Sequence, residues 1–261
     1  MIKINKVPCP QELTQKKQQD LTNQYITNGD SVWKKSYIKK ALLESSYEKC
    51  VYCECKLEVE SKYMEVEHFQ DKKTYPEKVI NWDNLLPSCK RCNVKKGNFD
   101  TKNFPFINPA EMDPKEHLIL NNFRLYPISS AGENTVGVLV LNDIEKLMKP
   151  RYGISDTVLI LLENIYNDTY AYIKNTEKKI KDRNSIISRL SNLMTRGTAK
   201  SEYAAFVATV LSNSHHFQLI YENLYAEGIW DQELQEKLNE INSNCLDTDV
   251  KKAKEYQNAM N

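Results

Sequence analysis

The sequence has neither a long apolar run nor a marked excess of one charge. No stretch of its 261 residues approaches the roughly 20 apolar residues that cross a bilayer. The amino end lacks the apolar segment of a secretory signal. The formal net charge of +1 excludes a histone-like protein that binds nucleic acid through overall charge. We therefore expect a cytoplasmic globular protein with no membrane partner.

Glycine is also scarce, with 7 residues in the chain. No glycine-rich loop of the kind that cradles nucleotide phosphates is present, and neither is an internal repeat or a low-complexity tract. Any step that consumes a nucleotide would therefore need a partner protein.

Cysteine is better represented, with seven residues, and four of them form two short pairs. The spacing of Cys50 with Cys53, and of Cys89 with Cys92, lets two thiolates reach one ion from a tight turn. Two such pairs supply the four sulfurs of a closed zinc site. The alternative is buried free thiols, while disulfides are disfavoured in a reducing compartment. Cys55 follows the first pair closely and could compete as a ligand, but a third thiol so close to a pair is more often a packing residue.

The segment between the two pairs is longer than in a simple zinc ribbon. It contains Glu67 and His68 at the end of residues 63–69, whose alternating pattern predicts a β-strand. Adjacent strand residues point to opposite faces. Glu67 and His68 can therefore have different roles at the same site.

Together, these residues resemble the HNH endonuclease motif of the ββα-metal fold. The resemblance rests on the two cysteine pairs, Glu67-His68, residues 82–85 (Trp-Asp-Asn-Leu) and residues 89–97, and it covers about residues 47 to 100. The last motif position is Asn93 instead of histidine, as in HNH enzymes that end in asparagine. A looser similarity, which rests on residues 39–43, 106–109 and 142–143, extends to about residue 151. It is to the HNH effectors of bacterial anti-phage systems, the PtuB proteins of Septu and related retron effectors.

The resemblance implies an α+β fold, with a zinc-stabilised ββα-metal, treble-clef-like core embedded in a mostly helical protein. We expect an N-terminal helical segment at 1–46, the nuclease core at 47–102, a β-hairpin and loop extension at 103–153, and a C-terminal helical region at 154–261 as a candidate partner-binding part.

Several elements outside the core follow from local patterns. We expect one helix capped by Asp30, separated by Asn28-Gly29 from an earlier polar helix. Residues 123–126 and 135–140 read as a strand pair. Apolar periodicity then predicts helices from residue 155 onward, with Gly197 and Gly228 as breaks; the later ones are 176–194, 201–213, 215–226 and 230–241.

The resemblance also implies roles for individual residues in phosphodiester hydrolysis. Histidine is the natural base near neutral pH, so we expect His68 to activate the nucleophile. A hard Mg²⁺ or Mn²⁺ ion takes oxygen ligands, which Glu67 and Asn93 supply. Asn84 is expected to hold the loop and orient His68. The alternatives are a helix cap or turn residue for Asn84, a helix cap for Asn93 and a solvated strand end for Glu67-His68.

Local charge adds a candidate nucleic-acid surface. Residues 72–102 contain eight basic and three acidic residues. Lys95 and Lys96, with Lys90 and Arg91 nearby, are expected to contact phosphates. The alternative is a solvated helix face.

The function expected from the resemblance is an HNH endonuclease acting on DNA or on structured RNA such as tRNA, as the effector of an anti-phage system. The subgroup resemblance further implies an SMC- or ABC-like ATPase partner of the PtuA type. The alternative is a non-catalytic zinc module that binds nucleic acid or protein. A cysteine-based redox protein would need a reactive thiol that does not coordinate the metal ion.

Overall fold

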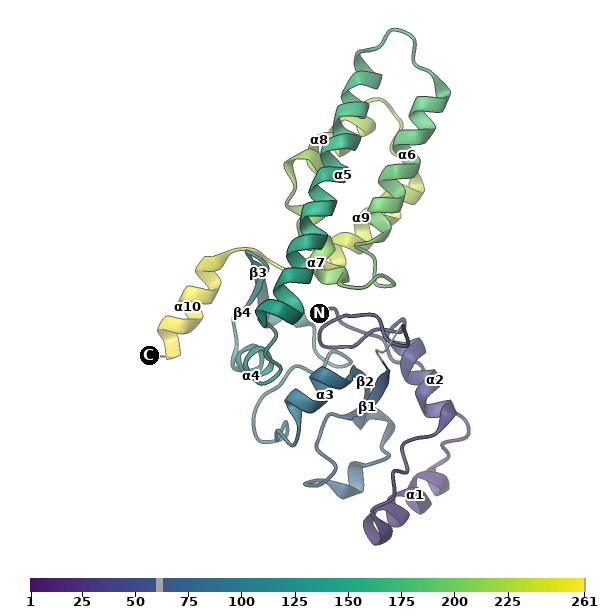
Figure 1. The fold of residues 1–261 in the computed structure, drawn as a ribbon, viewed down its shortest axis with the longest axis vertical. Coiled ribbons are helices and arrows are strands. Elements are labelled where there is room, and N and C mark those ends of the chain that lie inside the picture. Colours follow the sequence, from purple (N-terminus) through teal and green to yellow (C-terminus); the bar gives the residue numbers. More distant parts are fainter. Residues whose placement is uncertain (60–62, 261) are drawn as a thin grey trace. The chain divides into compact units, whose positions relative to one another are not determined.

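Figure 1 shows the computed structural model, which describes residues 1–59 and 63–260. The chain forms two compact units. Unit 1 contains Met1–Ile119, Leu125–Asn142 and Val250–Asn261, and unit 2 contains Leu120–Arg124 and Asp143–Asp249. The last helix of the chain belongs to unit 1, and the division into four consecutive segments stays a prediction.

Unit 1 begins with two helices, α1 (Gln15–Asn28) and α2 (Ser36–Ser45). α1 ends at Gly29 in the left-handed conformation that glycine adopts most readily, as the Asn28-Gly29 break predicts. The expected cap at Asp30 is wrong. The Asp30 carboxylate instead accepts a hydrogen bond from the Gln24 side chain, and the next helix starts only at Ser36.

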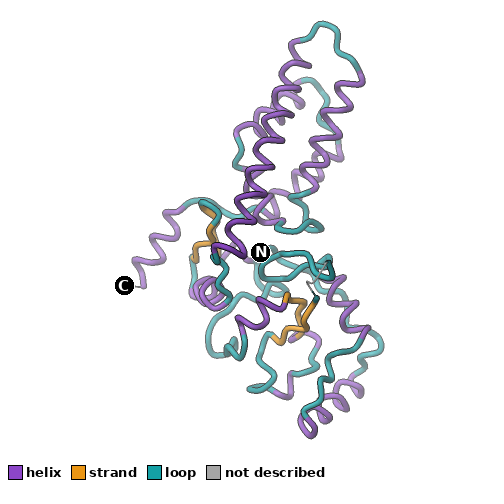
Figure 2. Tube along the Cα trace, in the orientation of Figure 1, coloured by secondary structure: helices purple, strands orange, loops and turns teal. Residues whose placement is uncertain are grey.

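The centre of unit 1 has the expected β-β-α order. Strand β1 (Met64–His68) pairs antiparallel with β2 (Leu85–Cys89), so that His68 lies opposite Leu85. Between the strands lie two short 3₁₀ helices, η1 (Pro76–Lys78) and η2 (Trp82–Asn84). Helix α3 (Lys90–Lys96) follows β2 without a loop, and Figure 2 shows this strand pair in orange. The mixed helix and strand composition agrees with the expected fold class.

An aromatic cluster ties the parts of this centre together. The Phe106 ring contacts the rings of Tyr52, Phe69 and Phe99, with centroids 6.1, 6.2 and 5.3 Å away. Tyr52 lies between the first two cysteines, Phe69 directly follows β1, and Phe99 follows α3. Phe106, itself buried, therefore joins three segments that lead into the site.

The predicted strand pair is only half correct. Strand β3 (Leu118–Asn121) pairs with β4 (Arg124–Pro127), whereas most of the predicted second strand lies in helix α4 (Ser130–Val138). The Ser129 hydroxyl caps this helix by accepting from the Gly132 amide. Gly132 packs so closely that an added Cβ would lie 2.2 Å from the His117 carbonyl oxygen. Capping and packing override the strand preference of the valines and Thr135.

Unit 2 is helical. It contains the π-helical turn η4 (Ile144–Met148) and the helices α5 (Lys149–Lys174), α6 (Ile180–Thr195), α7 (Ala204–Ser212), α8 (His215–Ala226) and α9 (Gln232–Asn244). The apolar periodicity thus located these helices correctly, although α5 starts six residues before the expected one. In residues 1–59 and 63–260, no helix is both long enough and apolar enough to span a membrane.

The remaining short elements belong to unit 1. The 3₁₀ helix η3 (Pro114–Glu116) precedes β3. Helix α10 (Val250–Met260) returns to unit 1, where the Tyr256 hydroxyl donates a 2.8 Å hydrogen bond to the Glu133 carboxylate on α4.

Candidate active site and metal centre

The four cysteines of the two predicted pairs come together in the interior of unit 1. Cys50, Cys53, Cys89 and Cys92 are all buried, and their sulfurs lie within 4.8 Å of one another. The Cys53 and Cys89 sulfurs are 3.7 Å apart. Two thiolates bound at 2.3 Å to one tetrahedral ion would be about 3.8 Å apart. The donor type and the spacing therefore fit a metal ion such as zinc.

The second pair also starts helix α3. The Cys89 sulfur accepts from the Cys92 amide at 3.4 Å and thereby caps the helix. Asn93 lies inside α3, so its alternative role as the helix cap is not supported. Cys55 is buried outside the group of four, and its carbonyl oxygen accepts from the Cys50 amide at 3.0 Å.

His68 ends β1 with its imidazole almost completely buried, at 4% exposure. Its Nε2 lies 2.9 Å from the Val79 carbonyl oxygen. Because a carbonyl only accepts, Nε2 carries the proton in this contact and Nδ1 keeps its lone pair. Burial, helped by the charges of Lys72 and Lys96, lowers the pKa of His68 to about 3. The ring is therefore neutral at pH 7, as a general base must be.

Glu67, the preceding residue, is buried with 1% exposure. Its Oε1 lies 2.6 Å from the Lys96 ammonium, whose own side chain is fully buried. The contact is close but poorly directed, since Oε1 has no partner with hydrogen-bond geometry. Burial raises the pKa of Glu67 to about 7 against the opposing charges of Lys96 and Lys72. Desolvation thus outweighs the ion pair.

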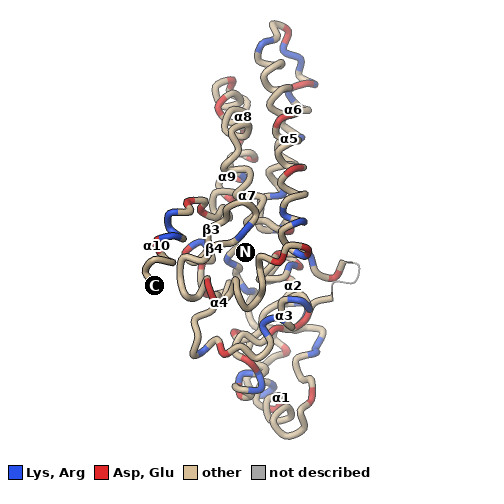
Figure 3. The backbone as a smooth tube through the Cα atoms, turned by 60° about the vertical axis from the view of Figure 1, so that its left-hand side comes forward, with Lys and Arg blue, Asp and Glu red and all other residues tan. Residues whose placement is uncertain are grey.

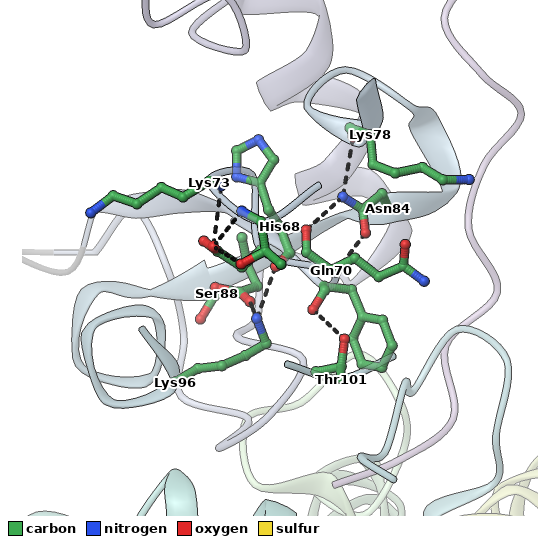
Figure 4. Close-up of polar contacts among 12 residues, drawn as sticks. His68, Gln70, Lys73, Lys78, Asn84, Ser88, Lys96 and Thr101 are labelled. Carbon is green, nitrogen blue, oxygen red and sulfur yellow. Dashed lines mark hydrogen bonds and ion pairs between the residues drawn. The ribbon is translucent and has the colours of Figure 1, made fainter. Parts of the chain in front are cut away.

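Lys96 also donates a 2.9 Å hydrogen bond to the His68 carbonyl oxygen. Figure 4 shows the Lys96 ammonium reaching the main chain of β1 while the His68 ring points away from it. The expected role of Lys96 as a phosphate contact does not fit this buried position. It is an internal cation that joins α3 to the end of β1.

Asn84 is buried and holds the loop that follows His68. Its Oδ1 accepts from the Gln70 amide at 2.7 Å, and its Nδ2 donates to the carbonyl oxygens of Gln70 and Lys78 at 3.0 and 3.1 Å. Lys78 immediately precedes Val79, the residue that binds the His68 ring. Asn84 therefore fixes the loop at both ends and reaches His68 through Val79, without contacting the imidazole directly.

The other predicted residues lie along α3. Asn93 is half-buried, and in the part of the chain that the structure describes its side chain makes no hydrogen bond. Residues three apart share a helix face, so Asn93 lies on the face of α3 that carries Lys96. Lys90 and Lys95 are exposed. Arg91 instead donates to the carbonyl oxygens of Leu139 and Val140 at the end of α4, which does not fit a phosphate contact.

Two residues that sequence reasoning left out of the site lie near His68. The Trp33 indole packs edge-on against the His68 ring, with centroids 4.9 Å apart and planes at 85°. The Lys72 ammonium lies 5.0 Å from the centre of that indole. Lys72 contributed only to a basic stretch in the sequence, and no local signal links Trp33 to His68, 35 positions away.

Comparison with known proteins agrees with this geometry. Residues 50–99 match the HNH endonuclease family, and this stretch contains the four cysteines and the Glu67-His68 pair. Fold and site thus define an HNH endonuclease domain.

The similarity extends well beyond that domain. The chain is 42% identical to the Septu protein PtuB of Bacillus thuringiensis, over 94% of this chain and 95% of that protein. It is 32% identical to the Septu protein PtuB of Bacillus mycoides strain KBAB4, over 42% of this chain and 48% of that protein. The chain belongs to the Septu PtuB family. No solved structure matches it.

Proposed function

We propose that this protein is a metal-dependent endonuclease that hydrolyses phosphodiester bonds, with His68 as the general base. The observation that carries the proposal is the hydrogen bond between Nε2 and the Val79 carbonyl. That bond leaves Nδ1 of a neutral ring free to accept a proton from water. As the water oxygen bonds to phosphorus, the bond from phosphorus to the leaving oxygen breaks, and solvent protonates the leaving oxygen.

Two kinds of metal site support this chemistry. The four cysteines hold a structural zinc ion. Glu67 and Asn93 hold a Mg²⁺ or Mn²⁺ ion, whose preference for oxygen donors matches a carboxylate and an amide. When bound, such an ion neutralises charge on the phosphoryl oxygens. The Glu67 carboxylate that would hold the ion also contacts the Lys96 ammonium.

The remaining predicted residues have supporting roles. Asn84 positions His68 through the loop that contains Val79. Lys90 and Lys95, both exposed on α3, contact phosphates that flank the cleaved bond.

We assign the substrate to nucleic acid, either DNA or structured RNA such as tRNA. A histidine base can activate water on either polymer, so the site itself does not select between them. We also assign it a cytoplasmic role as the effector of an anti-phage system of the Septu or retron kind, and the relatives named as Septu proteins support the first of these two kinds. A helical unit that the nuclease chemistry does not require supports an SMC- or ABC-like ATPase partner of the PtuA type. Failure of the two proteins to co-purify at any salt concentration would remove the partner proposal.

The decisive experiment incubates the full, zinc-loaded chain with plasmid DNA and with total tRNA, with and without Mg²⁺ or Mn²⁺. We expect ion-dependent cleavage of one polymer, and His68→Ala should abolish it while zinc content and circular dichroism stay unchanged. A zinc module that only binds nucleic acid would cleave neither polymer, and its binding would survive the substitution.

A further inference from the structure

Lys72 is a cation that lies on the Trp33 indole, which packs on the His68 ring, and its side chain is partly open to solvent. Its side chain is half-buried, and its ammonium lies 5.0 Å from the centre of the Trp33 indole, which in turn packs on His68. Within residues 1–59 and 63–260, no carboxylate pairs with Lys72. Its charge is therefore not neutralised by an ion pair in the protein.

No other basic side chain described here around the end of β1 is both near His68 and exposed to solvent. Lys96 is near but fully buried. Arg91 is bound to the end of α4, while Lys90 and Lys95 are exposed on α3. Lys96 and Lys72 are the two that approach His68, Lys96 through the His68 carbonyl oxygen and Lys72 through the Trp33 indole that packs on the ring. Of these two, only Lys72 can meet a substrate.

The main chain around Lys72 is held in place. Its carbonyl oxygen accepts a 3.3 Å hydrogen bond from the Tyr25 hydroxyl on α1. The preceding Asp71 carboxylate accepts from the amides of Lys73 and Thr74, both at 3.1 Å. The Tyr25 ring also packs edge-on against Trp33, with centroids 5.8 Å apart. The main chain from which the Lys72 side chain extends and the Trp33 ring on which its ammonium lies are therefore both fixed.

We propose that Lys72 is a further catalytic residue, whose ammonium contacts a non-bridging oxygen of the scissile phosphodiester, and that Trp33 positions it. This inference rests on the proposed nuclease function. Negative charge accumulates on the non-bridging oxygens as water attacks phosphorus and the leaving oxygen departs. The Lys72 ammonium offsets that charge and transfers no proton. The N-terminal segment that carries Tyr25 and Trp33 thereby becomes part of the active site.

The test compares Lys72→Met with Lys72→Arg and with the matched control Lys73→Met in the full, zinc-loaded chain. Methionine keeps an apolar stem against Trp33 but removes the charge. Lys73 is exposed, and Figure 4 shows its side chain extending away from the His68 ring. On whichever of plasmid DNA or total tRNA is cleaved, we expect Lys72→Met to lower kcat about 10²-fold or more, with KM changed less. Lys72→Arg should recover part of that loss, and Lys73→Met should stay within about threefold.

A second measurement does not depend on turnover. Affinity for the same plasmid or tRNA is measured at several salt concentrations in the His68→Ala variant and in the double variant that also has Lys72→Met. The double variant should have a slope of log affinity against log salt that is smaller by about 1. If Lys72→Met cleaves at the rate of the Lys73→Met control, the role of Lys72 is overturned. If the unmodified protein cleaves neither polymer, an unchanged slope of log affinity against log salt in Lys72→Met overturns it instead. Retention of cleavage by His68→Ala would instead refute the proposed function itself.

Discussion

Replacing Lys96 with methionine removes one partner of the buried ion pair and leaves Glu67 alone in the interior. Breaking a buried pair in this way costs about 3 to 5 kcal/mol, because the remaining charge has lost its compensation. Methionine fills a similar volume, so the loss reflects charge more than packing. We therefore expect Lys96→Met to lower the free energy of unfolding of unit 1 by about 3 to 5 kcal/mol at pH 8.

This effect should depend on pH in a defined direction. The pKa of Glu67 is raised from 4.5 to about 7 in the folded protein, so the folded state holds a proton that the unfolded state has lost between these values. Stability therefore falls as the pH rises from 4.5 to 7, by about 3 kcal/mol from this group alone. Without Lys96 the pKa of Glu67 rises further and the fall continues above pH 7. At pH 5 the Glu67 carboxyl is neutral. The free energy of unfolding of Lys96→Met should then fall by no more than about 2 kcal/mol, which is the order expected for loss of the hydrogen bond from Lys96 to the His68 carbonyl oxygen.

Hydrogen exchange of the β1 and β2 amides in the full chain measures this locally, because each amide reports the opening of its own part of the structure. Lys95→Met, on the exposed side of the same helix, should change stability by less than about 0.5 kcal/mol. Adding Glu67→Gln to Lys96→Met removes the stranded charge and should restore at least half of the loss at pH 8. A double variant as unstable as Lys96→Met, or a loss that does not depend on pH, would refute the assignment of Glu67 as the buried charge.

Three further predictions follow from the site. Asn84→Ala removes three hydrogen bonds from the loop and should cost about 2 to 3 kcal/mol, with kcat reduced more than KM; an unchanged melting temperature would contradict this. Chelation of the metal under reducing conditions should make residues around Cys50 and Cys92 sensitive to protease, while most of the helical circular dichroism of unit 2 remains. Complete loss of the circular dichroism signal would contradict the expectation that the two units are stable independently. Arg91→Met should speed hydrogen exchange at the end of α4 but leave cleavage within about threefold, whereas a loss above tenfold would restore Arg91 as a phosphate contact.

The parts of the site that the sequence predicts are those whose chemistry requires a fixed spacing. One ion can be held by two CxxC pairs only if all four sulfurs converge, and Cys50, Cys53, Cys89 and Cys92 do so. The end of β1 at His68 was predictable for a similar reason, since alternation and the motif both point to it. Local patterns of this kind need no knowledge of distant segments.

Other features depended on tertiary contacts that spacing does not report. Lys95 and Lys96 are equivalent in sequence, and only the rotation of α3 decides that one is exposed while the other is buried against Glu67. The approach of Trp33 to His68 joins segments far apart in the chain. Likewise, the helix at residues 130–138 arises from a cap at Ser129 and from close packing on the His117 carbonyl, which outweigh its strand-like composition.

The return of α10 to unit 1 affects how deletion experiments should be interpreted. Figure 3 marks the two ends of the chain. Helix α10 follows all of unit 2 in the sequence, although it belongs to unit 1. A truncation that removes the helical unit from its C-terminal side therefore also removes α10 and its Tyr256 bond to Glu133. Loss of activity in such a shortened protein would not map a function to unit 2. Excising residues 143–249 internally, with α10 retained, separates the two contributions.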